Sequence, residues 1–173
     1  LGSVLVNVGT GSVLVGRSKD GGMAKIAGEG HDKDLGSGYW MGKELFIKLS
    51  GQEQEKFPRI DVEEVLKSVQ SHFGESDLSI LLDGIMKSDD SVRKIASISK
   101  SLIQLAESGN ELALSIVQES TNYISDYLLY LLDIIEHDSS DLVAISNGGI
   151  INNKFYLASL NDALSFNMKQ VKW

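Results

Sequence analysis

Two glycines and two hydroxyl side chains lie together near the start of the chain, in Gly9-Thr10-Gly11-Ser12. Glycine lets the backbone approach an oxyanion closely and adopt positive φ. Successive backbone N–H groups in such a turn form a concave anion site, to which hydroxyl groups add donors. The stretch is therefore a candidate phosphate-binding turn. Taken alone, it is equally well explained as a plain tight hairpin turn.

Two better-known phosphate motifs are excluded by the context of this turn. Residues 11–18, GSVLVGRS, approach the P-loop pattern G-x-x-x-x-G-K-[ST], with Arg17 in place of lysine. The interior Val13-Leu14-Val15 favours a strand, and Asp20-Gly21-Gly22 makes another turn where a P-loop leads into a helix. A dinucleotide-binding fingerprint needs the same step from strand to helix. The pattern that remains is strand, glycine turn, strand.

A second glycine-rich stretch runs from Gly28 to Gly42, with five glycines in fifteen residues. That density is too high for a regular element. A polar loop that ends at an aromatic pair, here Tyr39-Trp40, commonly lines a ligand site. These aromatic residues can equally pack a helix start onto the sheet, and His31 can be a hydrogen-bonding loop residue. Asp34 is the acidic residue of this loop for which we expect a functional role.

The elements that position these stretches predict an α/β domain. Alternating aliphatic residues on both sides of the first turn predict a hairpin with strands at 4–8 and 12–17. A third strand at 23–27 makes three consecutive antiparallel strands, a β-meander. A buried-strand pattern at 142–146 is expected to lie parallel to the first strand, and a final short strand is expected at 168–172.

A helical insertion is predicted between the meander and the strand at 142–146. Helices are expected at 37–49, 62–73, 77–86, 89–108, 111–136 and, after the fourth strand, 154–164. Apolar residues recur every three or four positions along 111–136, the spacing of a core-facing stripe. We expect this helix to pack with 91–108 against one face of the sheet. Asp61, Asn110 and Asn153 are expected to cap the helices that follow them.

Composition and length indicate one globular domain, 1–173, with a sizeable core, since 42% of the residues are hydrophobic. The net charge of −8 argues against a nucleic-acid or anionic-membrane surface. The chain has no cysteine and so no thiolate-bound metal or iron–sulfur cluster, and its three histidines lack ligand spacing. The longest apolar run, 127–135, is too short to span a bilayer. With no signal peptide visible, we expect a cytoplasmic protein with no membrane or nucleic-acid partner.

Four motifs together resemble one known family. They are Gly9–Ser12, the pair Gly28–His31 and Asp34–Trp40, the stretch Ala106–Asn110 between two helices, and Ile145–Ile150 after a strand. Along nearly the whole chain this resembles the C-terminal lobe of the N-acetylglucosamine kinase-like family, also called the BadF/BadG/BcrA/BcrD ATPase family. These proteins belong to the actin-like ATPase superfamily, with a ribonuclease H-like fold. The resemblance implies one lobe of a two-lobe kinase. Since the sequence starts at Leu1 without an initiator Met, an N-terminal lobe is expected to be missing.

The resemblance also implies roles for individual residues and for ATP and Mg²⁺ as cofactors. Phosphate would be held by Gly9, Thr10, Gly11 and Ser12, the purine and ribose by Gly148 and Gly149, and the sugar by Thr10, Glu29, Gly30 and Asp34. The catalytic base is expected in the missing lobe, and no residue of this chain is expected to bind metal. Glu29 stands where the family usually has Trp, and Leu35 where it usually has the Glu of D-E-G-S.

The activity implied is ATP-dependent phosphorylation of a hydroxyl of N-acetylglucosamine, glucosamine or a related hexose, with a homodimer allowed. One alternative is an activator ATPase of a 2-hydroxyacyl-CoA dehydratase, but those relatives carry a cysteine-ligated cluster and this chain has no cysteine. The other alternative is a nucleotide-binding regulatory protein that has lost catalysis, which Glu29 and Leu35 would favour.

Overall fold

The computed structural model describes residues 3–137, 142–166 and 171–173. Within these ranges, five strands form one mixed sheet in the order β3-β2-β1-β4-β5. Their bounds are Ser3–Val8 for β1, Ser12–Arg17 for β2, Met23–Ala27 for β3, Leu142–Asn147 for β4 and Val171–Lys172 for β5. β2 pairs antiparallel with both β1 and β3, whereas β4 pairs parallel with β1 and with β5.

The alternation of the first strands explains their place in the sheet. Val4, Val6 and Val8 are buried, while the residues between them lie on the other face and are less buried. In the β1–β2 register Val8 faces Ser12, so only three residues form the turn. From here on we call these three residues together with Ser12, the stretch predicted to bind phosphate, the phosphate turn.

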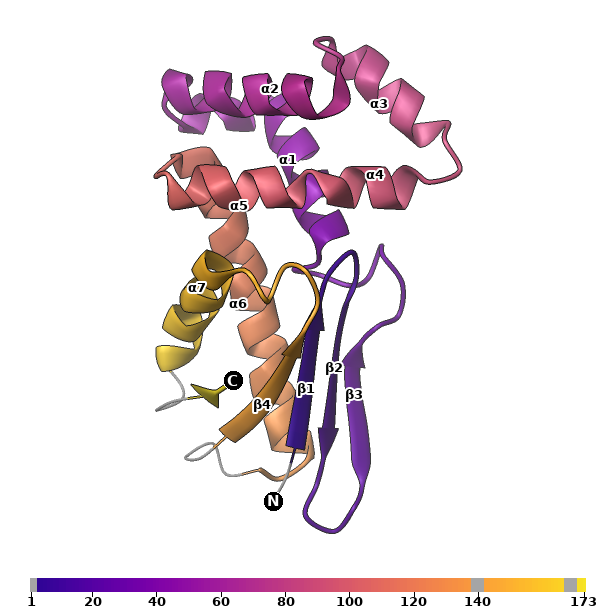
Figure 1. The fold of residues 1–173 in the computed structure, drawn as a ribbon, viewed down its shortest axis with the longest axis vertical. Coiled ribbons are helices and arrows are strands. Elements are labelled where there is room, and N and C mark those ends of the chain that lie inside the picture. The colour runs from indigo at the N-terminus through magenta and orange to yellow at the C-terminus, as the bar shows by residue number, and fades with distance from the viewer. Residues whose placement is uncertain (1–2, 138–141, 167–170) are drawn as a thin grey trace.

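The helices form two groups (Figure 1). α6 and α7 lie against one face of the sheet, and α1 to α5 stack beyond the edge at which the phosphate turn lies. The bounds are Gly38–Ser50 for α1, Arg59–Phe73 for α2, Leu78–Met86 for α3, Ser91–Ser97 for α4, Ser99–Glu107 for α5, Glu111–Ile134 for α6 and Lys154–Ser165 for α7, with a short 3-10 helix η1 at Gln52–Lys56. Of the described helices, none is both long and apolar enough to cross a membrane.

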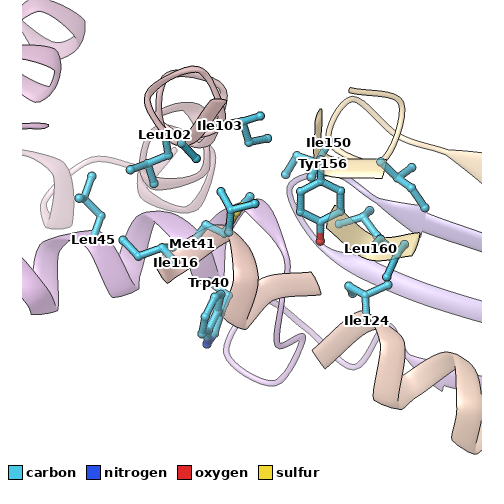
Figure 2. Packing of buried hydrophobic residues seen from close by; sticks show 14 of the residues in the cluster. Trp40, Met41, Leu45, Leu102, Ile103, Ile116, Ile124, Ile150, Tyr156 and Leu160 are labelled. Carbon is cyan, nitrogen blue, oxygen red and sulfur yellow. The ribbon is translucent and has the colours of Figure 1, made fainter. Parts of the chain in front are cut away.

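One hydrophobic core joins the two groups of helices (Figure 2). Met41 and Leu45 of α1 share this core with Leu102 and Ile103 of α5, whereas Trp40 points away from α5, and the apolar side of α6 continues the core toward the sheet. The apolar side of α6 is buried from end to end, as its periodicity predicted. α1 and α6 therefore connect the helical layer to the strands.

Several predicted boundaries need correction. The helix expected at 89–108 is interrupted at Ile98, which separates α4 from α5. The helix expected to start at 62 begins at Arg59, with Pro58 as its N-cap, because the Asp61 carboxylate instead accepts a hydrogen bond from the Glu111 N–H at 2.7 Å. The caps predicted at Asn110 and Asn153 are confirmed. The first residues of the strand expected at 168–172 lie outside the described ranges.

Candidate functional site

The phosphate turn and the later Gly148-Gly149 turn meet at one edge of the sheet. The N–H groups of Ile150 and Ile151 both donate to the Val8 carbonyl, at 3.2 and 3.3 Å. In the adjacent residue pair of β1 and β4, Asn147 Nδ2 donates to Asn7 Oδ1 at 3.0 Å. Because β1 and β4 are parallel, their carboxyl ends meet at the same edge, the usual place for a ligand in an open α/β sheet. Both stretches predicted to bind the nucleotide are thus neighbours.

The first residues of α1 hold the phosphate turn. Gly38 N donates to the Gly9 carbonyl at 2.8 Å, and Tyr39 N donates to the Thr10 carbonyl at 3.0 Å. Thr10 itself is exposed, so its hydroxyl is accessible. Neither Gly9 nor Gly11 is among the residues with positive φ, so glycine is not needed here for backbone conformation. At Gly9 the space that a Cβ would occupy is open, which leaves room for a ligand.

Ser12 faces inward from the start of β2 and is buried. Its hydroxyl donates to the Leu35 carbonyl at 3.2 Å. The side chain therefore ties the phosphate turn to the 28–37 loop. For the predicted phosphate role of Ser12, its hydroxyl would first have to leave the Leu35 carbonyl.

The carboxylate of Asp34, a residue of the 28–37 loop, lies beside the phosphate turn. Asp34 is 5% exposed, and its Oδ1 accepts a hydrogen bond from the Glu29 N–H at 2.9 Å. Its Oδ2 lies 3.2 Å from the position of a Cβ at Gly11, so a side chain at Gly11 would press on the carboxylate. The structure thus brings Asp34 to the phosphate turn, where a predicted sugar-binding carboxylate would have to be.

The two other predicted sugar-binding residues lie on the exposed part of the loop. Glu29 Oε2 is 3.5 Å from Lys33 Nζ, and both side chains are mostly exposed, so the pair contributes little to stability. Gly30 has a φ of +117° and nothing within 4 Å of a Cβ position. Its conformation favours glycine, and the space beside it is free for a ligand.

A buried hydrogen-bond chain supports the loop from behind. Ser120 Oγ donates to the Gly36 carbonyl at 2.7 Å and lies 2.7 Å from the Tyr156 hydroxyl. Gly36 has a φ of +74°, and a Cβ there would be 2.8 Å from the Ser120 carbonyl oxygen. Burial raises the pKa of Tyr156 well above its usual range, so the phenol stays neutral. Sequence reasoning missed both residues, although a serine inside the apolar stripe of α6 was a visible signal.

The aromatic residues of the loop have a packing role. Trp40 is buried and makes an edge contact with Tyr123, with ring centroids 5.3 Å apart. The rings of His31 and Tyr39 are also in edge contact, with centroids 4.8 Å apart. Burial, and after it the charge of Asp32, raises the pKa of Tyr39. These contacts agree with the packing interpretation of Tyr39 and Trp40.

Gly148 is sterically required to be glycine. Its φ is +111°, and a Cβ would lie 2.3 Å from the Val8 carbonyl oxygen. At the following Gly149 the space for a Cβ is open. The first glycine thus lets the segment that follows β4 pass close to the end of β1, while the second leaves space that a ligand can use.

One cavity borders the predicted site, and a larger one lies away from it. One of about 320 Å³ opens at Thr10 and is bounded on its other side by residues of α4 and of the segment before it. A larger cavity of about 420 Å³ lies at the opposite end of β2, between the β2–β3 turn and the end of α6, far from the predicted site residues. Within the described parts of the chain, no three His, Asp or Glu side chains are grouped as a metal site would require.

Comparison with solved structures shows that this fold occurs in other proteins. The chain shares its fold with two proteins proposed to be N-acetylglucosamine kinases. For the Porphyromonas gingivalis protein the TM-score is 0.70, with 18% identity over 98% of this chain and 56% of that one. For the Chromobacterium violaceum protein the TM-score is 0.64, with 16% identity over 95% of this chain and 52% of that one.

In sequence, the chain is similar to a particular sugar kinase. It is 26% identical over 175 residues to the N-acetylmuramic acid/N-acetylglucosamine kinase of Clostridium acetobutylicum, covering 98% of this chain and 55% of that protein. No protein-family model matches the chain. The resemblance to N-acetylglucosamine kinases is therefore confirmed, and the chain spans about half the length of these relatives.

Proposed function

We propose that this chain is one lobe of an ATP-dependent sugar kinase with the actin-like ATPase fold. The observation that carries the proposal is the meeting of the phosphate turn, the Asp34 loop and the Gly148-Gly149 turn at one edge of the sheet. The similarity to an N-acetylmuramic acid/N-acetylglucosamine kinase supports an amino sugar or related hexose as the substrate. We further propose that the rest of the kinase forms a second lobe, since each relative is nearly twice as long.

The proposed chemistry is transfer of the γ-phosphoryl group to a sugar hydroxyl. Such a transfer needs phosphate binding, an in-line hydroxyl and a base, with little covalent chemistry from the protein. In our proposal Thr10 donates to phosphate, Asp34 accepts hydrogen bonds from the sugar, and Gly148 and Gly149 let the nucleoside approach the backbone. Mg²⁺ would arrive on the phosphates, as is usual for this ion, and the base would come from the other lobe.

The test is a kinase assay on the longer protein that contains this chain. Supplied with ATP, Mg²⁺ and a panel of N-acetylglucosamine, N-acetylmuramic acid, glucosamine and glucose, it should release a sugar phosphate. Asp34→Asn should lower kcat/KM for the sugar by roughly 10- to 100-fold, because a charged hydrogen-bond acceptor is lost. The asparagine oxygen can still accept from the Glu29 N–H, so the loop should keep its shape.

Asp32→Asn is the matched control, since Asp32 lies in the same loop but is exposed, with its carboxylate 3.4 Å from His31 Nε2. It should leave kcat/KM nearly unchanged. If no sugar is phosphorylated and ATP is hydrolysed only with an iron–sulfur partner protein, the activator ATPase is the correct reading. Nucleotide binding without either activity would point to a regulatory protein.

A further inference from the structure

The cavity of about 320 Å³ beside the phosphate turn is lined in part by a positively charged side chain, Arg93, for which the sequence predicted no role. Thr10 and Arg93 both line it, together with Asp89, Asp90 and Val92. Building on the proposed function, we propose that Arg93 binds the phosphate chain of the nucleotide where it passes Thr10. The helical layer would thereby contribute a phosphate-binding residue from outside the turn.

Arg93 is available for this role because its charge is not already used. Its side chain is exposed, and it makes no ion pair with any residue that the structure describes. The next residue differs, since Lys94 Nζ lies 3.0 Å from Asp90 Oδ1. The hydrogen bond from Lys94 holds the pKa of Asp90 below its usual range. Asp90 is thus compensated by Lys94, which leaves Asp89 as the remaining acidic residue of the lining.

The backbone at Arg93 is held at a fixed place relative to Thr10. α4 packs so closely on α1 that a Cβ at Gly42 would be 2.1 Å from the Ile95 carbonyl oxygen. α1 in turn binds the phosphate turn through the hydrogen bond from Tyr39 N to the Thr10 carbonyl. Ile95 is buried in this contact. The position of α4, and with it the origin of the arginine side chain, is therefore set by the same helix that sets the turn.

A guanidinium complements what the turn can offer. Gly9–Ser12 supplies backbone N–H groups and hydroxyls but no positive charge. In phosphoryl transfer the negative charge spreads over the phosphate oxygens, and preorganised cations stabilise it. Arginine is suited to this because its planar fork of donors can bind two phosphate oxygens at once. Arg93, beside Thr10, would thus supply positive charge to the phosphate site and also orient the bound phosphate.

The experiment follows the turn itself by NMR in the ¹⁵N-labelled chain. Sodium tripolyphosphate, ATP and ADP are titrated separately at low salt, and the amide resonances of Gly9, Thr10 and Gly11 report binding. We compare the unchanged chain with Arg93→Met, Arg93→Lys and Lys100→Met. Methionine keeps an unbranched apolar stem of similar length. Lys100 is the matched control because it is an exposed cation of the next helix, α5, that does not line the cavity.

Arg93→Met should weaken tripolyphosphate and ATP binding roughly tenfold, from the loss of a charged hydrogen bond. Arg93→Lys should fall between, since lysine keeps the charge without the fork. Lys100→Met should change the Kd by less than about twofold, because solvent and salt screen an exposed charge that does not line the cavity. Added salt should weaken binding more steeply in the unchanged chain than in Arg93→Met.

The outcomes separate this proposal from the proposed function. Equal Kd values for the unchanged chain and Arg93→Met, with the turn resonances shifting in both, would reject Arg93 and leave the nucleotide site in place. No shift at the turn in the unchanged chain would reject both. Tripolyphosphate binding that depends on Arg93, without sugar phosphorylation by the longer protein, would keep the anion site and reject the kinase.

Discussion

The glycines at the site fall into two kinds, according to whether the space of a side chain is occupied or open. Gly148 is needed because the Val8 carbonyl occupies the space of a side chain, and Gly38 because a Cβ would lie 2.9 Å from the Gly9 carbonyl. Gly9 and Gly149 have no neighbour within 4 Å of that position. The glycines of the first kind bring backbone segments together, and those of the second leave space at the same edge.

Gly148→Ala should therefore destabilise the fold, whereas Gly149→Ala should not. We expect a loss of about 3 kcal/mol for Gly148→Ala, from backbone strain and from the clash with β1, and less than about 1 kcal/mol for Gly149→Ala. Urea denaturation of the two variants measures the difference. A Gly148→Ala chain as stable as the unchanged one would mean that β4 can move away from Val8 without cost.

Thr10→Val should weaken nucleotide binding with little effect on stability. The hydroxyl is exposed, so its removal leaves no buried partner unsatisfied. Loss of one hydrogen bond to a charged phosphate is worth roughly 1.5–3 kcal/mol. Calorimetry on the longer protein is the measurement, and an unchanged Kd would remove Thr10 from the phosphate site.

The residue-level prediction from sequence was strongest where chemistry is local. A cluster of glycines and hydroxyls in four residues, and an acidic residue in a glycine-rich loop, can be recognised without a structure. Arg93, Ser120 and Tyr156 could not be recognised in this way. Each lies in a helix, and its relation to the site depends on how that helix packs.

At the scale of elements, the 28–37 loop is held from two sides. The Ser12 hydroxyl binds it from the sheet, and the Ser120–Tyr156 pair binds it from α6 and α7. Ser120 has one hydroxyl proton, which it gives to the Gly36 carbonyl, so Tyr156 must be the donor in their contact. Loss of Ser120 would thus leave two buried groups unpaired, and loss of the phenol hydroxyl only one.

Ser120→Ala should consequently destabilise the fold more than Tyr156→Phe does. A lost hydrogen bond costs about 1 kcal/mol, and each buried group left without a partner costs about 1–3 kcal/mol. We expect about 1 kcal/mol for Tyr156→Phe and about 3 kcal/mol for Ser120→Ala. Urea denaturation measures the free energies, and hydrogen exchange of residues 28–37 should be faster in Ser120→Ala. The reverse order of stabilities would show that the hydrogen-bond direction is wrong.

The raised pKa of Tyr156 also predicts a pH dependence. In the unfolded chain the phenol ionises near its ordinary pKa of 10.0, whereas burial keeps it protonated in the folded state. Its contribution to stability is thus fully present below that pH and is lost as the pH rises above it, by about 1.4 kcal/mol per pH unit. The stability of the unchanged chain should fall more steeply above this pH than that of Tyr156→Phe. Parallel curves in alkaline urea denaturation would contradict the prediction.

Element boundaries were predicted well where periodicity was long and poorly where tertiary contacts decide. The 24-residue α6 and the first three strands agree with the expected ranges. The break at Ile98 and the start of α2 at Arg59 were not predicted. At the start of α2, a carboxylate that could have capped the helix binds the backbone of α6 instead.

At the scale of the whole molecule, one core runs from the helical layer to the sheet. The 173-residue chain should therefore fold alone, with a cooperative urea transition. If it is one lobe of a kinase, it should bind nucleotide weakly and show no turnover, because such kinases act when two lobes close on a substrate. Calorimetry and a kinase assay on the isolated chain measure this. Ordinary turnover would mean that a base lies within residues 1–173.

The central position of β1 has a consequence for how the molecule is made. β1 lies between β2, its immediate neighbour in sequence, and β4, so that Asn7 meets Asn147 across 140 residues of chain. On the ribosome, the first hairpin is complete long before its second partner strand has been synthesised. Such distant pairing slows folding and leaves an unpaired strand edge exposed in the meantime. The edge where the phosphate turn meets the Gly148-Gly149 turn is consequently assembled only after β4 has been synthesised and has paired with β1.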